Sequence, residues 1–197
     1  MEARNMTAIL LASGFSKRMG EDKLLLPFRG GTLLSHAVDL VASIPFGQRL
    51  LVIPPERRKR LRIPQNITVI LNTEAQRGQS ESVKLGVRAA TGQAYCFFAA
   101  DQPLLDRETV ECLLACSNDT RIVYPTGGGN PSGPVIFPAA FREALLCLEG
   151  DQGGRGIRRA HPEAQFPVVI SNPHLLHDID TRAEYKELLE NNRPLQK

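Results

Sequence analysis

The residues best suited to chemistry lie in a glycine-containing, basic segment near the start of the chain. The apolar run at residues 7–12 is followed by Ser13 and Gly14, and then by the basic residues Arg18 and Lys23. Small residues let the main chain close around a ligand, and its N–H groups can then bind phosphate oxygens. Arg18 offers a planar fork for phosphate, and Lys23 offers a mobile point charge. The segment therefore predicts a phosphate-binding loop, with an ordinary glycine-rich connection as the alternative.

Two common phosphate-binding motifs do not match this segment. A P-loop has four residues between its glycines and continues with Lys and Ser or Thr. Here five residues separate Gly14 from Gly20, and Glu21 follows. The dinucleotide fingerprint requires Gly-x-Gly-x-x-Gly, and the segment contains no Gly-x-Gly. Any phosphate site here must therefore be of another type.

Carboxylates that could hold a metal ion occur later in the chain. Asp101 directly follows the apolar run at residues 95–100, and Asp178 and Asp180 precede the last expected helix. Carboxylate oxygens suit Mg²⁺, which also binds the oxygens of a triphosphate. Local alternatives exist, because Asp101 can begin a turn or cap a helix and Asp180 can cap the last helix. Asp178 and Asp180 would face the same side of an extended chain, so spacing alone does not separate them.

Short apolar runs that alternate with helix-period segments must position these groups. The predicted strands are residues 7–12, 49–53, 67–71, 95–100, 121–124, 135–137 and 166–170. The predicted helices are residues 33–44, 80–90, 107–116, 139–148 and 181–190. This alternation predicts an α/β fold with a mostly parallel sheet, helices on both faces and a single domain over residues 1–197. Ligands should bind beyond the carboxyl ends of the strands, in the loops after Ala12, Leu71 and Ala100.

Composition limits the partners that the chain could have. The formal net charge of +3 is too small to imply nucleic acid as a ligand. No segment approaches the roughly 18 to 20 apolar residues that span a bilayer, and the first residues lack the features of a signal peptide. We therefore expect a cytoplasmic protein without a membrane partner. A basic run without interleaved aromatic residues is interpreted as the solvated surface of a short connection. It contains Arg57, Arg58, Lys59, Arg60 and Arg62.

The cysteines and histidines do not predict a metal centre or a nucleophile. The four cysteines form no Cys-x-x-Cys pair and are interpreted as reduced structural thiols. The four histidines are scattered and form no i, i+4 pair, so we interpret them as surface or structural groups. These residues are Cys96, Cys112, Cys116 and Cys147, and His36, His161, His174 and His177.

In the loop residues and carboxylates described above, and in their order along the sequence, the chain resembles the molybdenum cofactor cytidylyltransferases, within the wider group of molybdopterin-guanine-dinucleotide-type nucleotidyltransferases. The resemblance extends over nearly the whole chain and depends on five motifs. They are Leu11-Ala12-Ser13-Gly14 with Ser16, Arg18-Met19-Gly20 and Lys23-Leu24-Leu25; Asn72 with Gly78-Gln79-Ser80-Glu81-Ser82 and Gly86; Asp101-Gln102-Pro103-Leu104; Gly150-Asp151-Gln152-Gly153; and Asp178-Ile179-Asp180-Thr181.

The resemblance implies a Rossmann-like nucleotidyltransferase fold and assigns roles by position. Arg18, Lys23 and Asp101 would be catalytic, and Asp101 and Asp180 would hold Mg²⁺, which separates Asp180 from Asp178. The implied nucleotide-binding residues are Leu11, Ala12, Ser13, Gly14, Arg18, Lys23, Asn72, Gly78, Ser82 and Asp101.

The implied reaction transfers CMP from CTP to molybdopterin and releases pyrophosphate. A molybdoenzyme that receives the product is the implied protein partner. One alternative within enzymes is a nucleotidyltransferase that uses GTP or another phosphorylated acceptor, such as a sugar phosphate or methylerythritol phosphate. A second alternative is a non-catalytic factor that binds the finished cofactor and passes it to a molybdoenzyme.

Two departures from the family pattern bear on specificity. Ser13 stands where relatives carry Ala or Gly, and a side chain at this position favours a pyrimidine, unless the hydroxyl turns back to the loop. Residues 128–135 stand where relatives show Gly-His-Pro or Gly-Asn-Pro. Either Gly133 replaces the histidine, or Asn130-Pro131 is the matching pair and three residues are inserted. The glycines at 127–129 form either a flexible connection or an acceptor lid.

Overall fold

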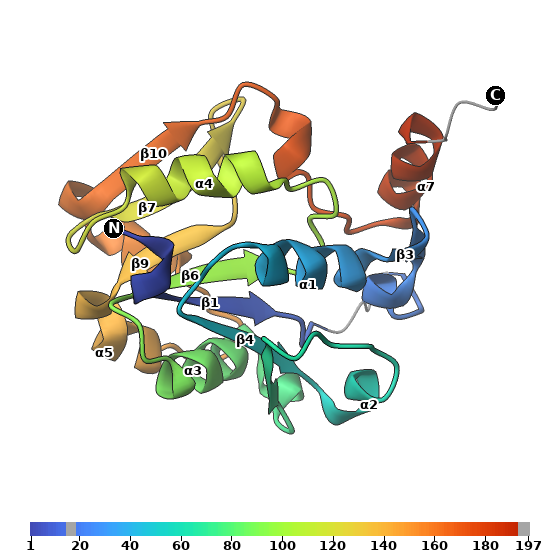
Figure 1. Cartoon of the computed structure of the whole chain (residues 1–197), viewed down its shortest axis with the longest axis horizontal. Helices are drawn as coiled ribbons and strands as arrows, with labels where there is room; N and C mark the ends of the chain where they lie inside the picture. Colours follow the sequence, from blue (N-terminus) through green and yellow to red (C-terminus); the bar gives the residue numbers. More distant parts are fainter. Residues whose placement is uncertain (15–18, 193–197) are drawn as a thin grey trace.

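A mixed β-sheet forms the centre of the computed structural model, which describes residues 1–14 and 19–192. The strand order across the sheet is β10-β7-β9-β6-β1-β4-β5, and β8 pairs with β7. The strands are β1 (Met6–Leu11), β4 (Gln48–Ile53), β5 (Thr68–Leu71), β6 (Ala94–Ala99), β7 (Ile122–Gly127), β8 (Asn130–Pro131), β9 (Val135–Pro138) and β10 (Gln165–Val169). β9 runs antiparallel to β6 and β7, whereas β1, β4, β5 and β6 are parallel. The carboxyl ends of these parallel strands therefore meet at one edge of the sheet (Figure 1).

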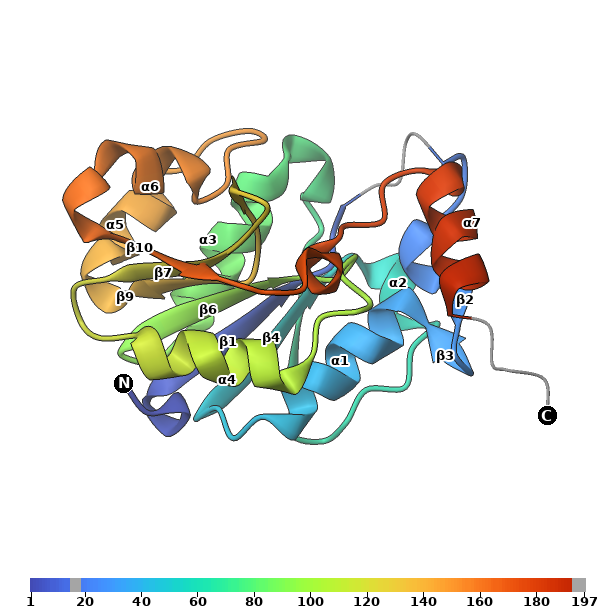
Figure 2. The same cartoon turned by 90° about the horizontal axis from the view of Figure 1, so that it is seen from above.

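Helices cover both faces of this sheet (Figures 1 and 2). The α-helices are α1 (Leu33–Ser43), α2 (Pro55–Arg58), α3 (Gln79–Ala89), α4 (Arg107–Cys116), α5 (Arg142–Leu146), α6 (Arg155–Ala160) and α7 (Arg182–Asn191). α1 and α4 lie on one face, and α3, α5 and α6 lie on the other (Figure 2). The predicted α/β fold is thus confirmed. None of the helices in this described part of the chain is long and apolar enough to cross a membrane.

Successive residues of the central strands enter opposite cores. Leu10 and Leu51 belong to the core that includes residues of α1 and α4. Their neighbours Ile9 and Leu50 belong to the core that includes residues of α3 and α5. Because side chains alternate along a strand, a sheet that is covered on both faces needs apolar residues at every position. This explains why the central strands are continuous apolar runs.

The structure differs from the predicted elements in several places, among them the short strands β2, β3 and β8, which were not predicted. The predicted helix at 139–148 is a 3-10 turn, η4 (Ala139–Phe141), followed by the shorter α5. The short helices α2 and α6 were not predicted, because four and six residues carry too little periodicity. The strand predicted at 121–124 continues to Gly127, because Gly128 and Gly129 adopt positive φ angles of 56° and 83°. Such angles form a tight turn that pairs β7 with β8.

The last helix packs beside the first part of the chain and away from the sheet. β2 (Pro27–Phe28) and β3 (Gly31–Thr32) form a small hairpin next to α7 (Figure 2). Leu188 of α7 packs in a cluster with Phe28, and the Tyr185 hydroxyl donates to the Pro27 carbonyl at 2.6 Å. Arg182 Nε, at the start of α7, also donates to the Met19 carbonyl at 3.2 Å.

Candidate functional site

A cavity of about 770 Å³ lies at the carboxyl ends of β1 and β6. Of the residues that sequence analysis assigned to the site, its lining includes Leu11, Ser13, Gly14, Lys23, Gly78, Ser82, Asp101 and Asp180. Ala12 and Asn72 are each only 1% exposed and lie behind this lining. Arg18 lies outside the described residues. The structure thus gathers most of the assigned residues around one space, as expected for a parallel α/β sheet.

Lys23 joins the two carboxylates that were expected to hold a metal ion. Its Nζ lies 2.8 Å from Asp101 Oδ2 and 2.7 Å from Asp180 Oδ1. Burial opposes the charged form of Lys23, but the attraction of the two carboxylates outweighs it and raises the pKa of the ammonium group. Asp101 and Asp180, although 79 positions apart, therefore converge on one cationic group. We call Lys23, Asp101 and Asp180 the carboxylate end of the cavity.

Neither carboxylate is used to cap a helix, so the capping alternatives from the sequence are wrong, although Asp101 does lie in a turn. Asp106, not Asp101, caps α4 by accepting a hydrogen bond from the Thr109 amide. Thr181 caps α7, and the Glu184 carboxylate accepts hydrogen bonds from the amides of both Asp180 and Thr181. This capping box fixes the main chain at Asp180 and leaves its side chain directed to Lys23.

Asp178 also interacts electrostatically with the carboxylates of the carboxylate end. Although the residue is exposed, protein atoms packed around its carboxyl group, together with the charges of Asp101 and Asp180, raise its pKa to about 6. The residue between the two aspartates, Ile179, is buried, and its amide donates to the Asp101 carbonyl at 2.9 Å. The two segments that carry the carboxylates are therefore linked directly through the main chain.

Arg57 is the clearest error of the sequence analysis. It was interpreted as part of an exposed basic run, but its side chain is only 4% exposed. Its Nε and Nη2 donate to the Asp22 carboxylate at 2.8 and 3.0 Å. Nη2 also donates to the Gly14 carbonyl at 3.1 Å, and Nη1 donates to the Ala12 carbonyl. Arg57 therefore joins the main chain after β1 to the residue that precedes Lys23.

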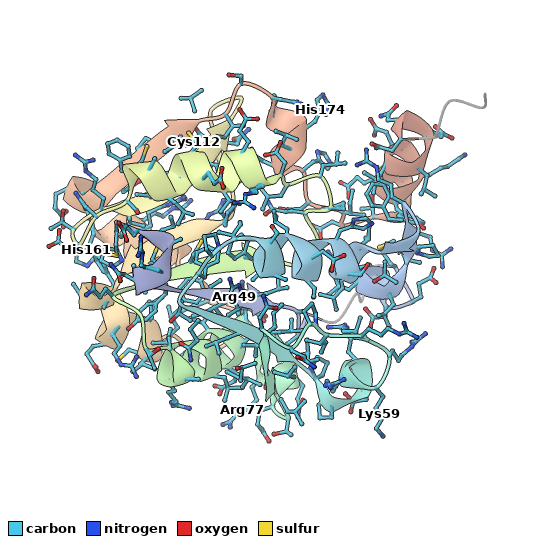
Figure 3. The ribbon with its side chains drawn as sticks, in the orientation of Figure 1. Arg49, Lys59, Arg77, Cys112, His161 and His174 are labelled. Atoms are coloured by element: carbon cyan, nitrogen blue, oxygen red, sulfur yellow. The ribbon has the colours of Figure 1, made fainter. Side chains whose placement is uncertain are left out.

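The remaining members of the basic run are exposed as predicted. They are Arg58, Lys59, Arg60 and Arg62. Lys59 extends away from the protein beyond α2 (Figure 3). Arg57 lies four residues after the carboxyl end of β4, but this position does not separate it from the exposed Arg58, so no signal in the sequence marked the exception.

The Ser13 hydroxyl is bonded to the main chain of β4, whereas the alternative from the sequence expected a bond to the main chain of its own loop. The Oγ atom donates to the Val52 carbonyl at 3.2 Å, and the side chain is buried. The neighbouring Ala12 amide donates to the same carbonyl at 2.9 Å. Ser13 still lines the cavity, but its hydroxyl is directed to β4.

Asn72 and Gly78 shape the wall formed by α3. Asn72 Nδ2 donates to Ser82 Oγ at 2.9 Å and so orients a residue that lines the cavity. Gly78 has a φ of 110°, and a Cβ at this position would lie 2.3 Å from the Gly150 carbonyl oxygen. The Ser80 amide donates to that carbonyl at 3.0 Å. The glycine motif at 150–153 is therefore packed directly against the start of α3.

One side of the cavity is formed by three residues that follow the β7–β8 turn, Pro131, Ser132 and Gly133. We call this side the hairpin end. The glycines that were interpreted as a flexible connection or a lid form a paired turn there. Gln102 is buried, and its Nε2 donates to Ser132 Oγ at 2.9 Å and to the Leu176 carbonyl at 3.1 Å. Sequence analysis did not predict this supporting role for Gln102.

Two arginines of α6 also line the cavity. Arg155 is exposed, whereas Arg158 is buried with its guanidinium carbon 4.1 Å from the centre of the Tyr124 ring. Burial lowers the pKa of Arg158 from its ordinary value. Sequence analysis did not single out either residue.

The histidines and cysteines take no part in the cavity lining. All four cysteines are free thiols, as predicted. His161 and His174 lie at separate edges of the molecule (Figure 3). Over residues 1–14 and 19–192, no group of three or more His, Cys, Asp and Glu side chains is arranged to hold a metal ion.

Comparison with known proteins agrees with this arrangement. The molybdenum cofactor cytidylyltransferase of Escherichia coli (strain K12) is 27% identical over 90% of this chain and 92% of the relative. A probable molybdenum cofactor guanylyltransferase of Mycobacterium avium (strain 104) is 26% identical over 95% of this chain and 96% of the relative. The crystal structure of Rv0371c in complex with manganese, from Mycobacterium tuberculosis H37Rv, superposes with a TM-score of 0.76 at 20% identity, covering 94% of this chain and 98% of that one. The family model for the MobA-like NTP transferase domain matches residues 8–165, and the chain belongs to this family of nucleotidyltransferases.

Proposed function

We propose that this protein transfers CMP from CTP to a molybdopterin-type acceptor and releases pyrophosphate. The observation that carries the proposal is the contact of Lys23 with both Asp101 and Asp180 at the carboxyl ends of the parallel strands. The name of the Escherichia coli relative supports CTP as donor and the molybdenum cofactor as acceptor. A molybdoenzyme would then receive the product.

The residues at the carboxylate end fit a divalent cation. Two carboxylates that lie within 2.8 Å of one ammonium group present their oxygens toward a single cation position. Mg²⁺ is bound in proteins by one or two carboxylates together with water and substrate phosphates, rather than by a cage of protein ligands. Asp101 and Asp180 would hold Mg²⁺, which, when bound, supplies positive charge to the phosphate oxygens.

The reaction needs positioning and charge more than proton transfer. A phosphate monoester of the acceptor is already anionic at neutral pH, so its attack on the α-phosphorus requires no general base. Lys23, which lines the cavity, would offset the negative charge on the transferred phosphorus group and on the departing pyrophosphate. The main chain at Ser13 and Gly14 would hold the triphosphate. We propose the same phosphate-binding role for Arg18.

The choice between CTP and GTP is a separate part of the proposal. GTP is the main alternative, because the Mycobacterium avium relative is named a probable guanylyltransferase. With the hydroxyl of Ser13 directed to Val52, the bulk that Ser13 presents to the cavity comes mainly from Cβ. We therefore expect Ser13→Gly to raise the kcat/KM for GTP relative to CTP by about tenfold, the lower part of the range for small steric changes. An unchanged ratio would remove Ser13 from the basis of specificity.

One experiment tests the function itself. The protein is incubated with Mg²⁺, molybdopterin and each nucleoside triphosphate in turn, and pyrophosphate release is measured. We expect release with CTP that depends on both molybdopterin and Mg²⁺. Release only with GTP, or only with a different phosphorylated acceptor, would replace the substrate assignment. Tight binding of the finished cofactor without pyrophosphate release would instead identify a non-catalytic assembly factor.

A further inference from the structure

We propose that Arg57 is a positioning residue that sets the conformation of the nucleotide-binding main chain and, through Asp22, the placement of Lys23. The proposal rests on the proposed function for its kinetic consequences, but its structural part can be tested without any substrate. Arg57 does not line the cavity itself. It would therefore act through the groups that it holds.

The contacts of Arg57 join two segments that flank the phosphate-binding region. On one side, its guanidinium group donates to the carbonyl oxygens of Ala12 and Gly14. On the other side, it forms a two-point ion pair with the Asp22 carboxylate at 2.8 and 3.0 Å. One planar group thus fixes the distance between Gly14 and Asp22, which the chain itself separates by seven residues.

The carbonyl contacts also determine where a neighbouring amide points. In a trans peptide group the C=O and N–H bonds point in opposite directions. Because the Ala12 carbonyl is directed to Arg57, the Ser13 amide N–H is directed away from it. Ser13 and Gly14 line the cavity, and main-chain N–H groups are the part of such a loop that binds phosphate. Arg57 therefore orients main-chain groups at the surface that a triphosphate would contact.

The contact with Asp22 extends this effect to Lys23. Asp22 Oδ1 accepts a hydrogen bond from the Leu24 amide at 3.2 Å and begins the 3-10 turn η2 (Lys23–Leu25). Lys23 is the first residue of this turn, and its side chain reaches Asp101 and Asp180. A change at Arg57 should therefore move both the phosphate-binding main chain and the lysine at the carboxylate end.

Burial explains why this site needs arginine. A buried guanidinium group is stable only where its charge and its N–H groups have partners, and Asp22 and the two carbonyls supply them. The planar guanidinium group donates to three acceptor groups at once. The ammonium group of a lysine carries its charge on one nitrogen at the end of a flexible side chain and could not match all three. We therefore expect Arg57→Lys to keep the charge but lose part of the positioning.

The test compares Arg57→Met and Arg57→Lys with Arg58→Met. Arg58 is the matched control, because it is the next residue of the same helix, is exposed, and contacts the Leu61 carbonyl only at 3.5 Å. Hydrogen exchange of single amides is followed by NMR in the protein without ligand. The Ala12 amide donates to the Val52 carbonyl and the Leu24 amide donates to Asp22, so both are protected and can report loosening. We expect Arg57→Met to speed exchange at Ala12 and Leu24 by about tenfold or more while leaving the central strands near wild-type rates. Arg57→Lys should fall between the two, and Arg58→Met should change neither amide.

Kinetics of the same variants supply the functional readout. We expect Arg57→Met to raise the KM for the triphosphate by about 10- to 100-fold, the range for removing a residue that supports a ligand-binding group. The KM for the acceptor should stay within about twofold, since the hydrogen bonds of Arg57 are with Ala12, Gly14 and Asp22, beside the proposed triphosphate site. Asp22→Asn should raise the KM for the triphosphate by less than Arg57→Met does. In the double variant the two effects should not add fully, because both substitutions break the same contact between Arg57 and Asp22.

Several results would overturn the proposal. They are wild-type exchange at Ala12 and Leu24 in Arg57→Met, faster exchange spread equally over the central strands, or equal rises in both KM values. If Arg57→Met does not fold, Arg57→Lys carries the same measurements, and wild-type values for it would count against the proposal. If the wild-type protein releases no pyrophosphate from any triphosphate, the proposed function fails, while the exchange measurement still decides the role of Arg57.

Discussion

At the carboxylate end of the cavity, Lys23 contacts Asp101 and Asp180 at less than 3 Å, whereas at the hairpin end the exposed Pro131 follows a turn of two glycines. The charged groups of the first region come from three distant parts of the chain and hold one another in place. The second region is supported by uncharged contacts, namely the buried Gln102 amide and the hydrogen bonds of Ser132 to the Leu176 and Pro125 carbonyls. We propose from this difference that changes at the carboxylate end alter catalysis and that changes at the hairpin end alter only acceptor binding.

The strongest test of this proposal is Asp101→Asn. An amide is a poor ligand for Mg²⁺ but has nearly the shape of the carboxylate, so we expect turnover to fall by about 100- to 1,000-fold with the fold retained. Pyrophosphate release at saturating substrates measures the effect, and circular dichroism checks the fold. Asp106→Asn is the matched control, because asparagine also caps a helix well and should leave turnover unchanged. Near wild-type release from Asp101→Asn would show that the metal role is wrong.

Two single substitutions in the segment before α7 test the same comparison more finely. We expect Asp180→Asn to lower turnover by about 100-fold, because its carboxylate contacts Lys23, and Asp178→Asn to lower it by less than about tenfold. Single-turnover rates of the two variants measure the difference. A larger loss for Asp178→Asn would reverse the assignment of the second metal ligand.

Lys23→Ala should change metal binding and catalysis in opposite directions. Without the ammonium group, Asp101 and Asp180 repel each other, so we expect Mn²⁺ alone to bind more tightly than to the wild-type protein. Turnover should fall by about 100-fold, because the charge that would stabilise the phosphates is lost. Calorimetric titration with Mn²⁺ and pyrophosphate release measure the two effects. Lys84→Ala is the control, since Lys84 pairs with Glu81 on α3, and weaker Mn²⁺ binding to Lys23→Ala would contradict the prediction.

The smallest effect is expected at the hairpin end, from Ser132→Ala. This change removes the Ser132 hydroxyl, which accepts from the Gln102 amide and donates weakly to the Leu176 carbonyl at 3.2 Å, while the bond from Gln102 to that carbonyl remains. A lost hydrogen bond of this kind is worth about 1 kcal/mol, which corresponds to roughly a fivefold rise in the KM for the acceptor. The KM for the triphosphate should not change. If it rises instead, the two ends of the cavity are not independent, and the comparison between them fails.

Much of the fold followed from the sequence because its signals are local. The predicted apolar runs end within one residue of the ends of β1 and β6, and Thr181 and Glu184 have the spacing of the capping box that begins α7. The contact of Lys23 with Asp101 and Asp180 was not predictable, since it joins residues 78 and 157 positions apart. The resemblance placed these residues in one site, but only the folded chain brings them into contact.

The burial of Arg57 was not predictable for a related reason. Its partners include main-chain carbonyls 43 and 45 positions earlier. Every residue has a main-chain carbonyl, so the residue types do not show which carbonyl will accept a hydrogen bond from Arg57. Within the basic run, nothing in the pattern distinguishes Arg57 from the exposed Arg58. Functional groups that are held by main-chain atoms are therefore the ones that sequence patterns miss most easily.

The contact between Gly78 and Gly150 has a consequence for how this cavity could change during evolution or in the laboratory. Because main chain meets main chain there, the separation of these two parts of the wall does not depend on the size of any lining side chain. Gln76, Gln79 and Asp151 also line the cavity and are exposed, so they could be randomised to seek new ligands without altering that separation. Gly78 itself offers no such freedom, since even a methyl group would force the two segments apart.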